Sequence, residues 1–288
     1  MTIFLTVLLA LVGVYLLLMG LVTWFSLKPM RLVQWFSPGM VGLPQVDVTI
    51  TTADGVRLSG WFSDAGQNKT VVAVHGYMMN RCEFAPYAQL FADEGWSLLV
   101  FDLRAQGKSG GKRVGLGCDE KADVEAAVAW AAARGDRVVL FGSSMGGVAC
   151  TLAAAAQPEV EAMILDGAYA SLDEAIDGWW EFVGFRGLSK WLYPVKWAGA
   201  WVVGIRPKTV LLRRALVDFA GRPALLMYGD NDPLVGMERI SELSDGLPEH
   251  QVLVFPGSTH GQARLDHGPA YRDALRGFLI ELDASPRL

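Results

Sequence analysis

The chain is 288 residues long, carries a formal net charge of −5 and is 52% hydrophobic. That length suffices for one large domain with a full core, and the charge offers no basic field to attract nucleic acid. The hydrophobic content is high for a soluble enzyme, so a membrane segment is expected. Cys82, Cys118 and Cys150 stand far apart, a spacing that does not indicate zinc. Their odd number fits a reducing compartment better than a disulfide framework.

The chain begins with a long apolar run, Thr2–Leu27, that contains no charged side chain. A helix needs about 20 apolar residues to cross a bilayer, so this run is long enough. Trp24 and Phe25 lie near its end, as in an interfacial aromatic belt, and Lys28 follows. A cleaved signal peptide has a shorter apolar stretch and a small-residue cleavage site, and a core helix rarely stays apolar on every face. We therefore interpret the run as a retained transmembrane anchor.

Basic residues follow this anchor at Lys28 and Arg31, which by the positive-inside tendency predicts that the rest of the chain is cytoplasmic. Residues 28–45 contain three prolines and two glycines. We interpret them as an interfacial linker between the single-pass anchor (residues 1–27) and one large domain (residues 46–288).

The large domain opens with two alternating segments, residues 46–51 and 56–62, around the turn signal Asp54-Gly55. This pattern predicts a β-hairpin. Short apolar runs then alternate with segments of helical period, which predicts a mainly parallel sheet covered by helices on both faces. The predicted strands are 70–74, 97–101, 137–141, 162–165, 224–228 and 252–255, and the predicted helices are 82–94, 119–134, 145–156 and 271–282.

In such a sheet, ligands bind at the carboxyl ends of the strands. One strand ends at Phe141, and Gly142-Ser143-Ser144-Met145-Gly146 follows as a G-x-S-x-G motif centred on Ser144. The sharp turn needs small residues beside the nucleophile and exposes its hydroxyl above the sheet. A Gly/Ser-rich start of a helix is the alternative. We predict Ser144 to be the nucleophile and Ser143 its neighbour.

A serine needs a base, and the chain has four histidines. His260 follows the last predicted strand, and the chain order Ser…Asp…His favours it as the partner of Ser144. His75 ends an inner strand, His250 precedes the last strand, and His267 lies at the start of the closing helix; we interpret these three as structural.

The base in turn needs a carboxylate to hold its tautomer. Asp230 and Asp232 follow the predicted strand 224–228. We favour Asp232, because Asp230 can shape the local turn. Asp166, at the end of the strand after the nucleophile helix, is a third candidate.

A developing oxyanion needs two preorganised donors. The backbone N–H of Met145 is one, and the loop His75-Gly76-Tyr77 supplies the other from the backbone N–H of Tyr77. Because a backbone group acts here, conservative substitution of Tyr77 is predicted to have little effect.

These motifs together resemble the α/β-hydrolase superfamily, from about residue 46 to residue 282. The resemblance implies an α/β-hydrolase fold with a mostly parallel sheet and a helical lid. Within the superfamily the chain is most similar to single-domain esterases, monoacylglycerol-lipase-like enzymes and membrane-anchored lysophospholipase-like relatives. Ala105 stands where many relatives have glycine, and the pair after the first inner strand lacks the glycine run of some lipases. The resemblance rests on His75-Gly76, Phe101–Gly110, the motif at Ser144, Gly229–Asp232 and His260-Gly261.

The predicted lid covers about residues 167–222, where half of the chain's ten tryptophans fall. Its aromatic side chains have two interpretations. They either pack only on the core, or they also dip into the membrane interface, where tryptophan is preferred and basic residues meet anionic lipid.

The sequence therefore predicts a serine hydrolase of carboxylic esters, or of thioesters, with an apolar acyl group. Ser144, His260 and Asp232 would act through an acyl-enzyme, with no metal or organic cofactor. The expected partners are a lipid or other apolar acyl ester and the membrane, not nucleic acid. The alternatives are a serine peptidase, an acyltransferase, the haloperoxidase branch that shares this triad, and a non-catalytic membrane scaffold. The sequence does not predict an oligomeric state.

Overall fold

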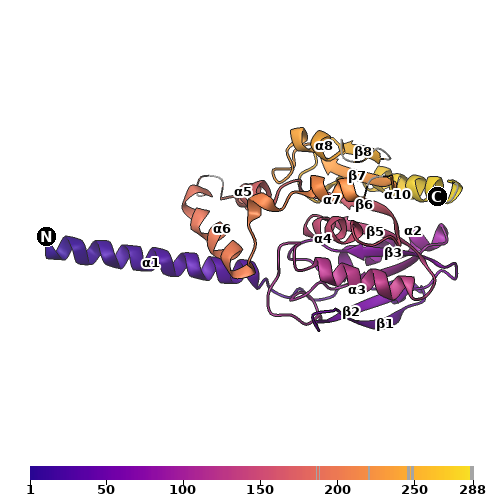
Figure 1. Cartoon of the computed structure of the whole chain (residues 1–288), viewed down its shortest axis with the longest axis horizontal. Helices are drawn as coiled ribbons and strands as arrows, with labels where there is room; N and C mark the ends of the chain where they lie inside the picture. The colour runs from indigo at the N-terminus through magenta and orange to yellow at the C-terminus, as the bar shows by residue number, and fades with distance from the viewer. Residues whose placement is uncertain (186, 188, 220, 245–246, 248–249, 286–288) are drawn as a thin grey trace.

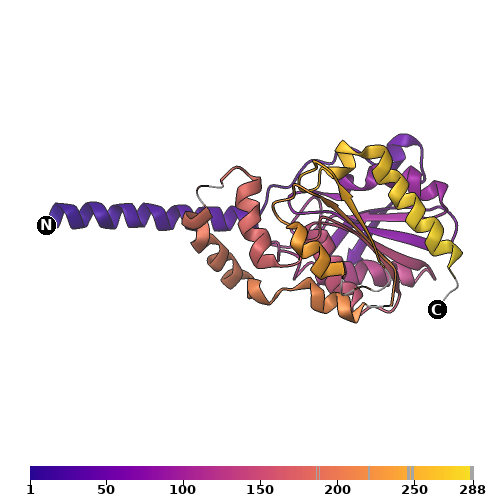
Figure 2. The same cartoon turned by 90° about the horizontal axis from the view of Figure 1, so that it is seen from above.

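The N-terminal helix α1 (Thr2–Leu27) projects far from the rest of the protein in the computed structural model (Figures 1 and 2). The structure describes residues 1–185, 187, 189–219, 221–244, 247 and 250–285. The most apolar window of α1 has no buried residue, so α1 is not a core helix. Its 26 residues extend about 39 Å, against about 30 Å of hydrocarbon in a bilayer. The helix is long and apolar enough to cross a membrane.

An eight-stranded sheet forms the centre of the remaining chain, in the order β1-β2-β4-β3-β5-β6-β7-β8. β1 and β2 form the predicted hairpin at one edge, β2 pairs antiparallel with β4, and all further pairs are parallel. Every predicted strand is present. The strands are β1 (Val46–Thr51), β2 (Arg57–Ser63), β3 (Lys69–Val74), β4 (Ser97–Phe101), β5 (Arg137–Ser143), β6 (Val160–Asp166), β7 (Ala224–Gly229) and β8 (His250–Phe255).

Helices cover both faces of the sheet, as the sequence predicts. One face packs against α3, α4, α7 and α8, and the other against α2, α9 and α10. These helices are α2 (Ala88–Asp93), α3 (Lys121–Ala132), α4 (Met145–Ala154), α7 (Leu212–Asp218), α8 (Met237–Ser244), α9 (Ala263–Asp266) and α10 (Gly268–Ala284).

The helix predicted over residues 82–94 is wrong in its first half. Two 3₁₀ turns, η2 (Arg81–Glu83) and η3 (Ala85–Tyr87), precede the short α2. Pro86 lies in η3. Because proline lacks an N–H group and its ring clashes with the preceding turn, an uninterrupted α-helix through this position is disfavoured.

The predicted lid insertion is helical, but only its first part projects from the body. Helices α5 (Leu172–Phe182) and α6 (Ser189–Val203) extend towards α1 (Figure 1). The chain then returns through η5 (Pro207–Thr209) to α7, which is buried against α4. Helices α1 and α6 are in contact, because α6 packs along α1 and the Tyr15 hydroxyl donates to the carbonyl of Trp191 at 2.8 Å.

The segment predicted as a linker lies against the domain that contains the sheet. It contains the short turn η1 (Pro38–Val41). Arg31 Nη1 donates to the carbonyl of Gly107 at 3.0 Å, and Asn80 Nδ2 donates to the carbonyl of Leu32 at 3.1 Å. These bonds fix the body relative to the end of α1.

Candidate active site

Ser144 lies at a sharp turn between β5 and α4, where the G-x-S-x-G motif predicts it. Its backbone angles, φ 50° and ψ −117°, are uncommon for a residue with a side chain. A Cβ at Gly146 would lie 2.3 Å from the carbonyl oxygen of Val74, and one at Gly142 would lie 2.6 Å from the backbone of α4. Both positions therefore exclude any larger residue, which explains the glycines of the motif.

The three predicted triad residues come together in one chain of hydrogen bonds. His260 Nε2 lies 2.7 Å from Ser144 Oγ, and His260 Nδ1 lies 2.7 Å from Asp232 Oδ2. The second carboxylate oxygen, Oδ1, accepts from the backbone N–H of Leu234 at 2.8 Å. Asp232 and His260 are both buried. This geometry suits a ring with Nδ1–H donating to the carboxylate and Nε2 accepting from the serine hydroxyl.

The two alternative carboxylates take other partners. Asp230 is exposed, and its Oδ1 accepts from the backbone N–H of Gly257 at 2.6 Å, which is the turn-shaping role expected of it. Asp166 Oδ2 accepts from the Tyr271 hydroxyl at 2.8 Å behind the site. Asp232 is therefore the carboxylate that the geometry favours.

The remaining histidines have structural contacts. His75 Nε2 accepts from the backbone N–H of Leu103 at 2.9 Å, so its Nδ1–H is free to donate to the carbonyl of Gly76 at 2.8 Å. Complete burial lowers the pKa of His75, which keeps the ring neutral. His267 contacts a backbone carbonyl of the preceding loop at 3.0 Å. His250 begins β8, at the end of the strand opposite to His260.

The two predicted oxyanion donors flank the nucleophile. Met145 follows Ser144 at the start of α4, and both it and Tyr77 line the pocket over the nucleophile. Gly76, the residue before Tyr77, is close enough that a Cβ there would lie 3.6 Å from Ser144 Cβ. The amide of Ser144 itself donates to the carbonyl of Asp166 at 2.8 Å and is therefore occupied.

A buried carboxylate that the sequence does not predict lies behind the loop His75-Gly76-Tyr77. Glu83 Oε2 accepts from the backbone N–H of Gly76 at 2.8 Å, and its other oxygen pairs with Arg264. Burial alone would raise the pKa of Glu83, but the Arg264 guanidinium and the Gly76 N–H hold it below its usual value. Glu83 follows the polar residues Asn80 and Arg81 within two to three positions, so nothing in the local sequence distinguishes it as a buried carboxylate.

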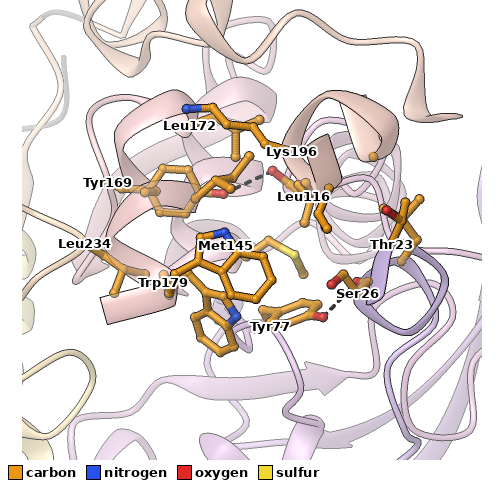
Figure 3. Close-up of a pocket in the computed structure, with 17 residues that line it drawn as sticks. Thr23, Ser26, Tyr77, Leu116, Met145, Tyr169, Leu172, Trp179, Lys196 and Leu234 are labelled. Atoms are coloured by element: carbon orange, nitrogen blue, oxygen red, sulfur yellow. Dashed lines mark hydrogen bonds between the residues drawn. The ribbon is translucent and has the colours of Figure 1, made fainter. Parts of the chain in front are cut away.

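An apolar pocket lies over Ser144 and has about 740 Å³ of empty space, its open mouth included (Figure 3). Aromatic rings connect its wall to the triad: Tyr77 to Trp179 at 5.2 Å, Trp179 to Phe182 at 5.7 Å, and Phe182 to His260 at 5.8 Å between centroids. Three residues of α1, namely Thr23, Ser26 and Leu27, also line this pocket. Within the described ranges, no three His, Cys, Asp or Glu residues form a group that could hold a metal ion.

The fold and this geometry are those of an α/β hydrolase with a serine nucleophile. Residues 65–211, half of the chain, match the family model described as "Serine aminopeptidase, S33", and the chain belongs to this family of hydrolases. An uncharacterized protein of Mycobacterium tuberculosis is 28% identical over 276 residues, covering 91% of each chain. The uncharacterized protein YqkD of Bacillus subtilis is 27% identical over 230 residues, covering 75% of this chain and 72% of its own. An esterase of Pyrococcus furiosus, Pf2001, superposes with a TM-score of 0.76 at 27% identity, covering 89% of this chain and 98% of its own.

Proposed function

We propose that the protein is a membrane-bound serine esterase that hydrolyses carboxylic esters with an apolar acyl group. The observation that carries this proposal is the unbroken chain of 2.7 Å contacts from Asp232 through His260 to Ser144. The likeness to an esterase of Pyrococcus furiosus supports an ester substrate. A thioester would react through the same steps.

The mechanism follows from these contacts. His260 Nε2 accepts the proton of Ser144 as Oγ attacks the ester carbonyl, and Asp232 stabilises the imidazolium that forms. The backbone N–H groups of Tyr77 and Met145 donate to the oxyanion of the tetrahedral intermediate. The intermediate collapses as His260 returns the proton to the leaving alcohol. Water, deprotonated by the same ring, then releases the acid from the acyl-enzyme.

The pocket lining favours an ester over a peptide with a free N-terminus. Binding a protonated α-amine requires an opposite charge or several acceptors. Lys196 is the one charged side chain among the described residues that line the pocket, and it has the wrong sign. The chemistry of this lining therefore favours an ester over the peptide substrate that the family's description as an aminopeptidase implies. An acyltransferase would use the same triad, and product analysis with and without an added alcohol separates it from a hydrolase.

The contact of α6 with α1 supports a substrate that comes from the membrane. If α1 crosses about 30 Å of hydrocarbon, about 9 Å of its length is left outside. Tyr15, which bonds to Trp191 of α6, lies twelve residues before Leu27, or about 18 Å along the axis. The lid would thus reach into the leaflet. Exposed aromatic side chains suited to that interface are Trp191, Tyr193, Trp197 and Trp201.

Lys28 and Arg31, directly after α1, favour a cytoplasmic location of the catalytic body. Protease protection of a C-terminal tag in sealed, right-side-out vesicles tests this orientation. Digestion of the tag only after permeabilisation is expected, and digestion in intact vesicles contradicts it.

Labelling with a fluorophosphonate probe tests the hydrolase. The detergent-solubilised full chain is compared with the variants Ser144→Ala and Ser143→Ala. Labelling of the parent and of Ser143→Ala, with none of Ser144→Ala, is expected. A folded parent that is neither labelled nor active on any ester of a chain-length series would contradict the proposal and favour the non-catalytic scaffold.

A further inference from the structure

The last turn of the anchor helix contributes to the pocket over Ser144. Thr23, Ser26 and Leu27 line it, and the first two are labelled in Figure 3. Thr23 and Leu27 are the two buried residues of α1. The rest of α1 is exposed or only partly buried, as a lipid-facing helix would be. The end of the anchor is therefore built as part of a binding cavity, unlike the remainder of the helix.

This wall is held in a fixed position. The last four carbonyls of a helix have no partner within the helix. Here the Tyr77 hydroxyl donates to the carbonyl of Ser26 at 2.7 Å, and the N–H of Val114 donates to the carbonyl of Leu27 at 2.9 Å. Both donors belong to the catalytic body, and one of them is the residue whose amide is proposed to bind the oxyanion. The anchor therefore ends as a docked element of the site and not as a loose tether.

The lid helix α6 contributes the neighbouring part of the wall. Lys196 lines the pocket with its aliphatic stem, because its ammonium group pairs with the carboxylates of Asp173 at 2.7 Å and Asp177 at 3.0 Å on α5. Gly199 also lines the pocket and is buried, yet a Cβ added there would meet no atom within 4 Å. That position therefore faces open space inside the cavity.

From this geometry we propose that α1 and α6 together bound the acyl-binding part of the site, and that Thr23 and Gly199 determine how long an acyl chain it accepts. The inference rests on the proposed function, because it names the part of the site that receives the acyl group. The ester carbonyl lies at Ser144, and the acyl chain extends towards the last turn of α1. The anchor thus selects the substrate as well as binding the membrane.

The test compares the full chain with Gly199→Phe and Thr23→Phe in the same detergent micelles. The measured quantity is the ratio of kcat/KM for p-nitrophenyl dodecanoate to that for p-nitrophenyl acetate. Filling the cavity is expected to lower this ratio by about tenfold or more, since a pocket discriminates by roughly that factor for each methylene that it excludes. Thr23→Ala enlarges the cavity at the same wall and is expected to raise the ratio.

Gly20→Phe is the matched control. Gly20 is a glycine of α1 that is exposed and has no atom within 4 Å of its Cβ position, but it does not line the pocket. Its variant should keep the parent's ratio. A fall of the ratio in Gly20→Phe equal to that in the two pocket variants would overturn the inference, because the effect would then come from the micelle.

Fluorophosphonate labelling separates this inference from the proposed function. If Gly199→Phe and Thr23→Phe are labelled as the parent is and keep its ratio, the acyl assignment is wrong while the esterase stands. If the folded parent is neither labelled nor active on either ester, the esterase itself is wrong. Should a Phe variant lose labelling, Gly199→Leu and Thr23→Ala replace it, and an unchanged ratio in both overturns the assignment.

Discussion

The hydroxyl of Tyr77 donates a 2.7 Å hydrogen bond to the carbonyl of Ser26 in the last turn of α1. The same residue presents the amide proposed for the oxyanion, and its ring packs edge-on against Trp179 of the lid. One residue thus contacts the end of α1 and helix α5, and it lines the pocket over Ser144. The sequence predicts a role for the backbone of Tyr77 alone, and the structure adds a role for its side chain.

Tyr77→Phe separates these two roles. The variant keeps the amide and the ring but loses the hydroxyl, so kcat is expected to stay within about threefold of the parent. The free energy of unfolding should fall by about 0.5–1.5 kcal/mol, the usual net contribution of one hydrogen bond. Denaturant unfolding in detergent and kcat on a short ester measure the two effects. A fall in kcat of about a hundredfold or more with unchanged stability would mean that the hydroxyl takes part in catalysis.

Asp232→Asn is expected to lower kcat by about a thousandfold or more, because an amide at Nδ1 stabilises the wrong tautomer and leaves the imidazolium without a counter-charge. Asp230→Asn is the matched control two residues away. Its Oδ1 bond to the N–H of Gly257 can be kept by an amide oxygen, so kcat should stay close to that of the parent. Equal losses in both variants would show that the turn, and not the carboxylate, matters.

Glu83→Gln tests whether the buried carboxylate positions the oxyanion loop. The variant keeps an acceptor for the N–H of Gly76 but removes the charge opposite Arg264. Removing one charge of a buried pair costs about 3–5 kcal/mol of stability. We also expect kcat to fall with KM nearly unchanged, because the oxyanion donor of Tyr77 contributes mainly in the transition state. Thermal unfolding and steady-state kinetics are measured together; a lower Tm with an unchanged kcat would leave Glu83 a purely structural role.

Much of the site follows from local sequence, because short patterns determine it. The elbow at Ser144 needs glycines on both sides, and the order of strands brings His260 and Asp232 to the same sheet edge. The preference for Asp232 over Asp230 rests on turn chemistry and agrees with the bonds that the two carboxylates make. The turn at Ser144 and the choice of Asp232 could therefore be predicted from residues that are close together in the sequence.

Contacts between segments that are far apart in the sequence could not be predicted in this way. Glu83 and Arg264 lie on separate elements, and no pattern of neighbouring residues in the sequence predicts that the two side chains pair. Thr23 belongs to a run whose uniform apolar composition predicts only a membrane helix, so its place in the pocket was not predictable. The helix predicted from residue 82 is based on the helical period of the segment. Pro86 is the residue in that segment that disfavours such a helix.

A second buried carboxylate makes stability depend on pH. Glu120 accepts from the N–H groups of Gly115 at 2.7 Å and Gly117 at 2.8 Å. Burial raises the pKa of Glu120 to about 7; the negative charge of Asp123 adds to this effect and the two N–H groups oppose it. In the unfolded chain the carboxyl has its usual pKa of about 4.5.

Between these two values the folded chain holds a proton that the unfolded chain has lost. The contribution of Glu120 to stability is therefore fully present below about pH 4.5 and is lost as pH rises through about 7. Glu120→Gln removes the group that titrates. It also replaces one of the two acceptor oxygens with an NH₂ group, which lowers stability by an amount that does not depend on pH. The Tm of the parent relative to that of the variant should thus fall between about pH 5 and pH 7 and level off above about pH 8. Thermal scans of both proteins at one scan rate, in the same detergent, measure this difference. A difference that stays constant across the range would mean that Glu120 is ionised throughout, and that the N–H groups of Gly115 and Gly117 outweigh its burial.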